Sequence, residues 1–181
     1  LQQALVDAER AGGDARTART QTLAAMATLA LAEPQLAAYR AVALKEPLQR
    51  SLKLKQARLA VAQAALQRVA DYGVPEAVTA ATFHSAELFR AFGRALLDSE
   101  RPKTLRRKAE REQYDVLLEE QAFPFEEKAI ALHETNAERA AEWPADPWVR
   151  RSLVALGELV PARWAAAART AAGPAPAEAK P

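Results

Sequence analysis

Between Pro47 and Tyr72, apolar residues recur at spacings that alternate between three and four. They are Leu48, Leu52, Leu59, Ala62, Leu66 and Val69, and Lys55 fills the one gap. This spacing places the side chains on one stripe of an α-helix, whereas a strand would need a period of two. The segment is therefore predicted to be a helix that ends at Gly73 and buries a heptad seam against another helix. Leu52, Leu59 and Leu66 are predicted to be buried.

Proline and glycine divide the rest of the chain into further helical segments. The expected helices span residues 1–11, 15–44, 47–72, 75–99 and 109–141, and a last helix begins at residue 147. Asp14 is expected to cap the second helix, and Pro34 is expected to kink or divide it. Pro124 is expected to interrupt the helix of residues 109–141. Pro161 is expected to bend the end of the last helix.

The composition favours helices packed closely against one another. Half of the 181 residues are hydrophobic, but only 6% are aromatic and only 6 are glycine. Long helices joined by short turns pack as antiparallel neighbours. We therefore predict an all-α fold of antiparallel helical hairpins, stacked as an array with a C-terminal capping helix. More than about two thirds of the residues should be helical, against a typical one third, and strands should be absent.

Three regions are expected along the chain. Residues 1–12 are predicted to be the end of a preceding helix, and residues 13–170 form the helical array. Residues 171–181 are rich in proline and alanine and have little to bury, which predicts a disordered tail. No apolar run approaches the roughly 18 residues that a membrane-spanning helix needs.

Several segments also carry a resemblance to a known family. They are Val69–Val74, Ala80–Phe89, Ala95–Lys103 and Glu119–Ile130. Together they resemble the C-terminal region of large tetratricopeptide-repeat (TPR) proteins of the proteobacterial envelope, over about residues 47–164. The resemblance implies a TPR-like superhelical solenoid that docks other proteins and works in the periplasm or at the envelope. It carries over no catalytic residues.

The residues that support catalysis or metal binding are sparse. The chain has no cysteine, and neither His84 nor His133 has a second histidine at metal-binding spacing. No glycine-rich phosphate loop or nucleophile motif is present. We therefore predict no catalytic, cofactor-binding or metal-binding residues, and no cofactor. An enzyme with paired acids between Glu119 and Glu127 is the alternative, and it would need carboxyl groups in a cleft.

The distribution of charge along the chain is the feature that most favours binding to another protein. Lys and Arg number 25 against 23 Asp and Glu, so the net charge is only +2 and nucleic acid is not an expected partner. The charges are nevertheless segregated. Residues 112–142 hold nine acids against two bases, whereas residues 40–58 hold six bases against one acid. Either the two patches face each other, or the acidic helix has an open face that binds a basic protein.

The candidate partner-binding residues fall into three groups. They are the acids Glu119, Glu120, Glu126 and Glu127, the bases Arg106, Arg107 and Lys108, and the tryptophans Trp143 and Trp148. Each group also has a plain structural interpretation. The charged residues could form solvated or mutually paired surfaces, and the tryptophans could pack in the core of the closing helix.

These patterns together favour a non-catalytic module that binds other proteins and serves as a scaffold. The alternative is a coiled-coil-like oligomerisation module that uses the Leu48–Val69 seam between chains. A seam filled by the residue 15–44 helix of the same chain would favour the first interpretation.

Overall fold

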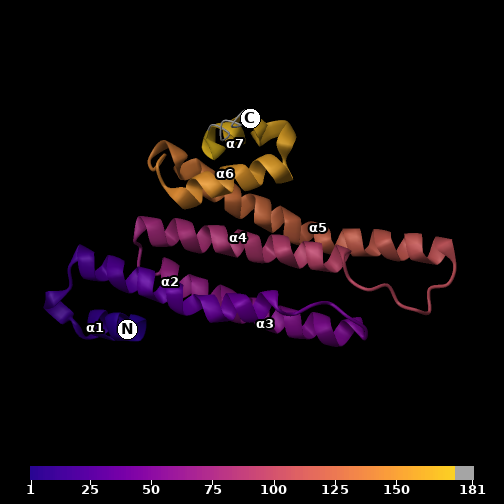
Figure 1. Ribbon diagram of the computed structural model, residues 1–181, viewed down its shortest axis with the longest axis horizontal. Coiled ribbons are helices and arrows are strands. Elements are labelled where there is room, and N and C mark those ends of the chain that lie inside the picture. The colour runs from indigo at the N-terminus through magenta and orange to yellow at the C-terminus, as the bar shows by residue number, and fades with distance from the viewer. Residues whose placement is uncertain (174–181) are drawn as a thin grey trace, which may run out of the picture.

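The computed structural model describes residues 1–173 and is built of helices joined by short connections (Figure 1). The described residues are 82% helical and contain no strand, so the predicted all-α class is confirmed. The helices are α1 (Gln2–Ala11), α2 (Ala18–Arg40), α3 (Leu48–Ala70), α4 (Pro75–Leu97), α5 (Lys108–Glu138), α6 (Pro147–Leu159) and α7 (Pro161–Ala172). Short 3-10 helices span Gly13–Ala15 and Arg139–Ala141.

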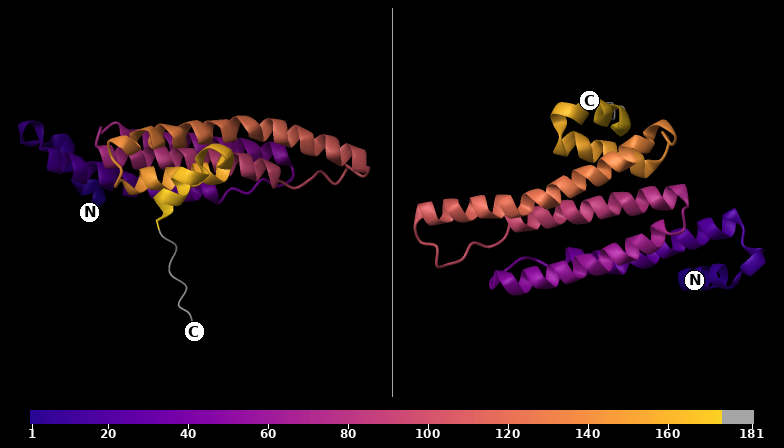
Figure 2. Two further views of the ribbon diagram at one scale, coloured as in Figure 1. Left: turned by 90° about the horizontal axis from the view of Figure 1, so that it is seen from above. Right: turned by 180° about the vertical axis from the view of Figure 1, so that it is seen from behind.

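Helix α4 lies at the centre of the arrangement. It contacts α2 and α3 on one side and α5 and α6 on the other (Figures 1 and 2). Each helix also packs against its neighbour in sequence, from α1 on α2 to α7 on α6. A helix that is apolar on more than one side is suited to this position between two layers.

The main core lies where α2, α3 and α4 meet. Leu59 is 7% exposed and Leu66 is 1% exposed, which confirms both as core residues. Leu52 is only half-buried, because it lies near the start of α3 and packs at the edge of the core cluster. The seam is therefore filled within the chain. Phe92 of α4 stacks on Phe125 of α5 at 4.2 Å between ring centroids, which continues the apolar contact into the next layer.

Lys55, the polar residue in the heptad seam, is buried with 3% exposure. Its Nζ donates to the carbonyl of Val42 at 2.8 Å and lies 4.4 Å from the centroid of the Tyr39 ring. The Tyr39 hydroxyl in turn donates to the carbonyl of Leu88 at 2.7 Å. Burial lowers the pKa of Lys55 and raises the pKa of Tyr39. Lys55, which interrupts the apolar seam, thus connects α3 by polar contacts to Tyr39 of α2 and to Val42 in the loop that follows α2.

Several predicted helix ends differ from the structure. Thr17, not Asp14, caps α2, through a reciprocal pair of hydrogen bonds with Thr20. Helix α2 ends at Arg40 rather than Leu44. The left-handed stop predicted after α3 is confirmed at Gly73, with φ +67°.

Neither Pro34 nor Pro124 divides its helix, which corrects the predicted interruptions. A proline inside a helix removes one backbone hydrogen bond and costs about 3 kcal/mol. Both rings lie on exposed positions, whereas the opposite faces of the two helices are buried against their neighbours. The packing of α2 and α5 against their neighbours outweighs this local cost.

The end of the chain forms two helices where one bent helix was predicted. Val160 leaves the helical conformation with φ −133° and ψ 65°, and α7 then folds back on α6. Trp164 therefore lies on α7. The two helices approach closely at Gly157, where an added Cβ would overlap with Ala168.

The predicted tail needs a correction at its start. Ala171 and Ala172 belong to α7, and Arg150 donates two hydrogen bonds to the carbonyl of Ala171 at 3.0 and 2.9 Å. These bonds satisfy a carbonyl that a helix C-terminus leaves without a partner. Residues 174–181, where the rest of the tail was predicted, lie outside the described residues.

Candidate protein-binding surface

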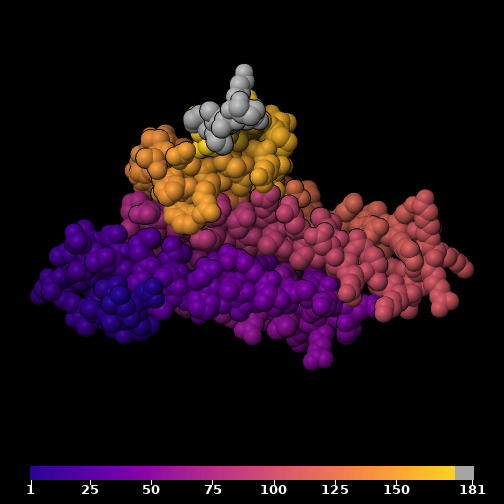
Figure 3. Space-filling model, in the orientation of Figure 1, coloured from indigo at the N-terminus to yellow at the C-terminus, as the bar shows by residue number. Residues whose placement is uncertain are grey.

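The first half of α5 presents a long face to solvent. This half of the helix and the loop before it project beyond the body of the molecule (Figure 3). Its inward side carries the buried Leu118 and Ala122, and a set of exposed side chains points outward around the rest of the helix. We call this outward set the acidic stripe; it consists of Val116, Glu119, Glu120, Phe123, Glu126 and Glu127.

All four glutamates predicted as binding residues are exposed on this helix. None of them forms an ion pair or a side-chain hydrogen bond within residues 1–173, as the pairs that do form involve other residues. Of the four, Glu126 lines a hollow of about 230 Å³ beside Arg90 and Arg94, and Glu119, Glu120 and Glu127 do not line it, so this hollow does not hold the acid pair that the enzyme alternative requires. From residue 112 to residue 127 the helix holds six acids and no base.

The acidic stripe also contains exposed apolar side chains that the sequence analysis did not single out. Phe123 is 62% exposed and Val116 is 53% exposed, and the neighbouring Leu117 is 48% exposed. The signal was present in the sequence, because Val116 and Phe123 lie seven residues apart between the acids and share a helix face. Exposed aromatic residues beside charge are typical of protein-binding surfaces.

The predicted basic group lies at the start of the same helix, where it is partly paired. Arg107 lies 3.8 Å from Glu110, and Lys108 lies 3.6 Å from Glu112. Arg106, in the loop before α5, is exposed. The two ion pairs are local and highly exposed, which limits each to about 0–1 kcal/mol. Part of the basic run therefore pairs with the first turns of its own helix.

The two tryptophans lie at the other end of the molecule and do not form a pair. Trp148 is half-buried, with its ring 5.5 Å from Phe83 and 4.9 Å from His84 between centroids. The guanidinium of Arg151 lies 4.9 Å from the Trp148 ring. Trp143 makes no ring contact among the described residues. Burial, followed by the positive charge of Arg40, lowers the pKa of His84.

A buried chain of hydrogen bonds beneath this aromatic cluster was not predicted. His133 of α5 contacts Ser152 of α6 through Nδ1 at 3.2 Å, and Glu87 of α4 through Nε2 at 3.2 Å. Asn136 donates to the hydroxyl of Ser152 and accepts from Arg139, at 3.0 and 2.7 Å. With the proton of the ring on Nε2, Glu87 accepts from it and the Ser152 hydroxyl donates to Nδ1.

The order Glu87, His133, Ser152 matches the residue types of a hydrolase triad, but the surroundings differ. His133 and Ser152 are both 0% exposed, and the Ser152 hydroxyl already accepts from Asn136. The hydroxyl therefore faces a fixed partner rather than a substrate space. Burial alone would raise the pKa of Glu87, but the hydrogen bond from His133 and the charge of Arg90 lower it overall. This network joins three helices.

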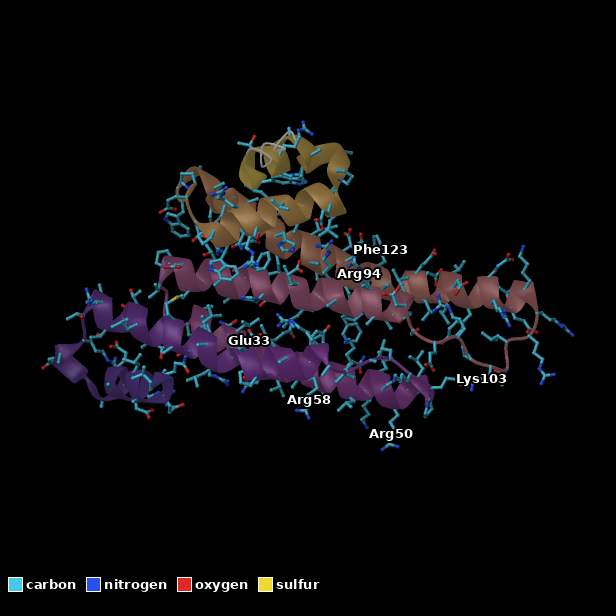
Figure 4. The ribbon with its side chains drawn as sticks, viewed as in Figure 1. Glu33, Arg50, Arg58, Arg94, Lys103 and Phe123 are labelled. Carbon is cyan, nitrogen blue, oxygen red and sulfur yellow. The ribbon has the colours of Figure 1, made fainter. Side chains whose placement is uncertain are left out.

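A second charged face lies on α3. This helix contains five bases and no acid, and one of the bases is the buried Lys55. We call its outward set the basic stripe; it consists of Arg50, Lys53, Leu54, Arg58 and Val61. Leu54 is 49% exposed and Val61 is 50% exposed, and the three bases are exposed without an ion pair in the described part of the chain. Figure 4 shows Arg50 and Arg58 on the edge opposite Phe123.

A hollow of about 620 Å³ lies between α1 and the α2–α3 pair, and none of the predicted binding residues lines it. Among residues 1–173, no helix is long and apolar enough to cross a membrane, and no group of three acidic or histidine ligands converges for a metal.

Comparisons with models of known protein families, with curated proteins and with solved structures found no match to this chain. The resemblance to envelope TPR proteins therefore stays a prediction.

Proposed function

We propose that this chain is a non-catalytic protein-interaction module, a TPR-like scaffold that binds a basic protein partner through the acidic stripe of α5. The observation that carries the proposal is the exposure of Glu119, Glu120, Glu126 and Glu127 around Phe123. Electrostatic complementarity guides association and partner choice, and an aromatic residue supplies contact area.

The packing order supports a stacked-hairpin interpretation. Helices α2, α4 and α6 contact one another in succession, and each also packs against the helix that follows it in sequence. Stacking hairpins in this way buries apolar faces that a single hairpin cannot bury, and it leaves extended surfaces for partners. The TPR likeness and a periplasmic or envelope location rest on the sequence resemblance, and both belong to this proposal.

The alternative of a coiled-coil oligomerisation module used the Leu48–Val69 seam between chains. That seam packs against α2 and α4 of the same chain, with Val69 fully buried. The part of the seam from Leu59 to Val69 therefore has no surface left for another chain, which favours the scaffold proposal over this form of the alternative.

The test is affinity capture from a proteobacterial envelope extract, with bound proteins identified by mass spectrometry. The wild-type chain is compared with a variant that carries Glu119→Lys, Glu120→Lys, Glu126→Lys and Glu127→Lys. The control makes the same charge change at four exposed acids elsewhere, Glu46, Glu76, Glu100 and Glu142. Circular dichroism checks that both variants stay helical.

We expect the control to keep the wild-type partners and the α5 variant to lose them. Raising the salt concentration should also weaken capture, because exposed charges are screened beyond about 8 Å at physiological ionic strength. A folded α5 variant that captures the same proteins as the wild type would show that the acidic stripe does not bind them.

A further inference from the structure

The basic stripe of α3 is a second helix face without a partner inside the described chain. The opposite side of α3 is already filled by the core, at Leu59, Ala62 and Leu66. The outward side continues with a 3–4 spacing through Arg50, Leu54, Ala57 and Val61, so α3 has apolar residues on two sides. A helix of this kind is normally packed between two others.

The apolar residues of the two stripes have the same spacing. Leu54 and Val61 lie seven residues apart on α3, and Val116 and Phe123 lie seven residues apart on α5. Seven residues span about 10 Å along a helix. All four side chains are 49–62% exposed. One pair can therefore pack against the other along two helix turns.

The charges of the stripes are opposite and occupy matching places. Place α5 antiparallel to α3, with Phe123 opposite Leu54 and Val116 opposite Val61. The pair Glu119 and Glu120 then lies opposite Arg58. The pair Glu126 and Glu127 lies opposite Arg50 and Lys53. Within one molecule the stripes lie on opposite edges and cannot make this contact (Figure 4).

We propose that the acidic stripe of one copy binds the basic stripe of α3 on a second copy. This inference rests on the proposed function, because it names the partner of the same α5 site. The contact is heterologous, so each copy keeps one open stripe and further copies can add head to tail. A single helix pair is a small interface, which places self-association in the weak and salt-sensitive class.

The experiment is sedimentation velocity of the whole chain. The concentration runs from ~10 to ~500 μM, the range of a weak interface. Each series is measured at ~50 mM and ~500 mM salt, which brackets the screening length. One variant reverses the acidic stripe with Glu119→Lys, Glu120→Lys, Glu126→Lys and Glu127→Lys. A second variant reverses the basic stripe with Arg50→Glu, Lys53→Glu and Arg58→Glu.

The control variant reverses three exposed bases outside α3, Arg19, Lys103 and Arg169. It should associate like the wild type. We expect the wild type to form species that grow with concentration at low salt. Each stripe variant alone should associate at least ~10-fold more weakly, since like charges then meet in the interface.

Mixing gives the decisive result. An equimolar mixture of the two stripe variants restores both complementary contacts, and so does one chain that carries both sets of reversals. Recovery of assembly in both samples supports the proposal. Variants that had failed to fold would not recover assembly in this way. A wild type that stays monomeric at low salt overturns it, as does assembly that ignores both reversals or a mixture that stays monomeric.

The outcomes separate this inference from the proposed function. If the wild type stays monomeric but the acidic stripe is still required to capture a different protein, self-association is wrong and the binding function stands. If the acidic stripe is required for neither, both proposals fall.

Discussion

Ser152→Ala is expected to destabilise the protein far more than its small loss of volume suggests. The Ser152 hydroxyl is fully buried, lies 3.2 Å from Nδ1 of His133 and accepts from Asn136, and it donates to Nδ1 when the ring proton is on Nε2. Removing it leaves the His133 nitrogen without a donor inside the protein, and an unsatisfied buried polar group costs about 1–3 kcal/mol. The Asn136 side-chain amide also loses an acceptor, but it still donates to the carbonyl of Thr79 at 3.0 Å, so it keeps one of its two hydrogen bonds as a donor. We expect a total of about 2 kcal/mol from these terms.

Ser99→Ala is the matched control, because it is the same substitution at a site that is only 5% exposed. The Ser99 hydroxyl donates to the carbonyl of Leu96 at 2.7 Å. That carbonyl also accepts the backbone N–H of Ser99 at 3.2 Å, so the substitution orphans no group. We expect a cost of about 0.5 kcal/mol, near the lower limit for one hydrogen bond.

Urea unfolding followed by circular dichroism measures both free energies of unfolding. The Ser152 variant should also melt about 4–8 °C below the wild type, at 2–4 °C per kcal/mol for a chain of this size. Equal costs for the two substitutions, within about 0.5 kcal/mol, would refute the reasoning. The hydrogen bonds among α4, α5 and α6 would then not contribute to stability.

Three further results are expected. Leu59→Ala should lower the free energy of unfolding by about 2–5 kcal/mol in urea melts, as a buried seam residue does, and a cost below 1 kcal/mol would contradict its place in the core. Lys55→Met should raise it by about 1 kcal/mol, because it removes a buried charge while filling the space over Tyr39; an equal gain from the exposed Lys53→Met would contradict that cause. Since the pKa of Glu87 is lowered in the fold, its carboxylate stabilises the protein above the ordinary glutamate range, and this contribution is lost as pH falls through the folded pKa. The free energy of unfolding, measured by urea melts from neutral to acid pH, should therefore fall less steeply for Glu87→Gln than for the wild type. Parallel falls of the two free energies with pH would contradict this role of Glu87.

Patterns that repeat along a helix were predictable from the sequence. The seam of α3 has a regular spacing, and its burial at Leu59 and Leu66 followed from that spacing alone. The exposure of Glu119 and Glu120 followed in the same way. Helix ends were less predictable, because the Thr17 cap and the continuous helix at Pro34 depend on local competition and on packing by distant helices.

The buried network was beyond sequence reasoning for a different reason. His133 and Asn136 are three residues apart on α5, which gives them a common face but no visible partner. Their partners Glu87 and Ser152 come from other helices, and only the tertiary arrangement brings them together. The break at Val160 was missed because the apolar stripe of α6 continues in sequence through Trp164, while the chain turns back at Pro161.

The segregation of charge on α3 and α5 is not explained by folding. An exposed ion pair contributes about 0–1 kcal/mol, and the stripe residues form no ion pairs within the described chain. Placing like charges together on one helix face instead costs a few tenths of a kcal/mol for each pair of neighbours, roughly 0.2–0.5. Exposed Leu54 and Phe123 likewise contribute nothing to the core. Features that cost stability and are spaced to match each other are most simply explained by binding, which is the common basis of both proposals.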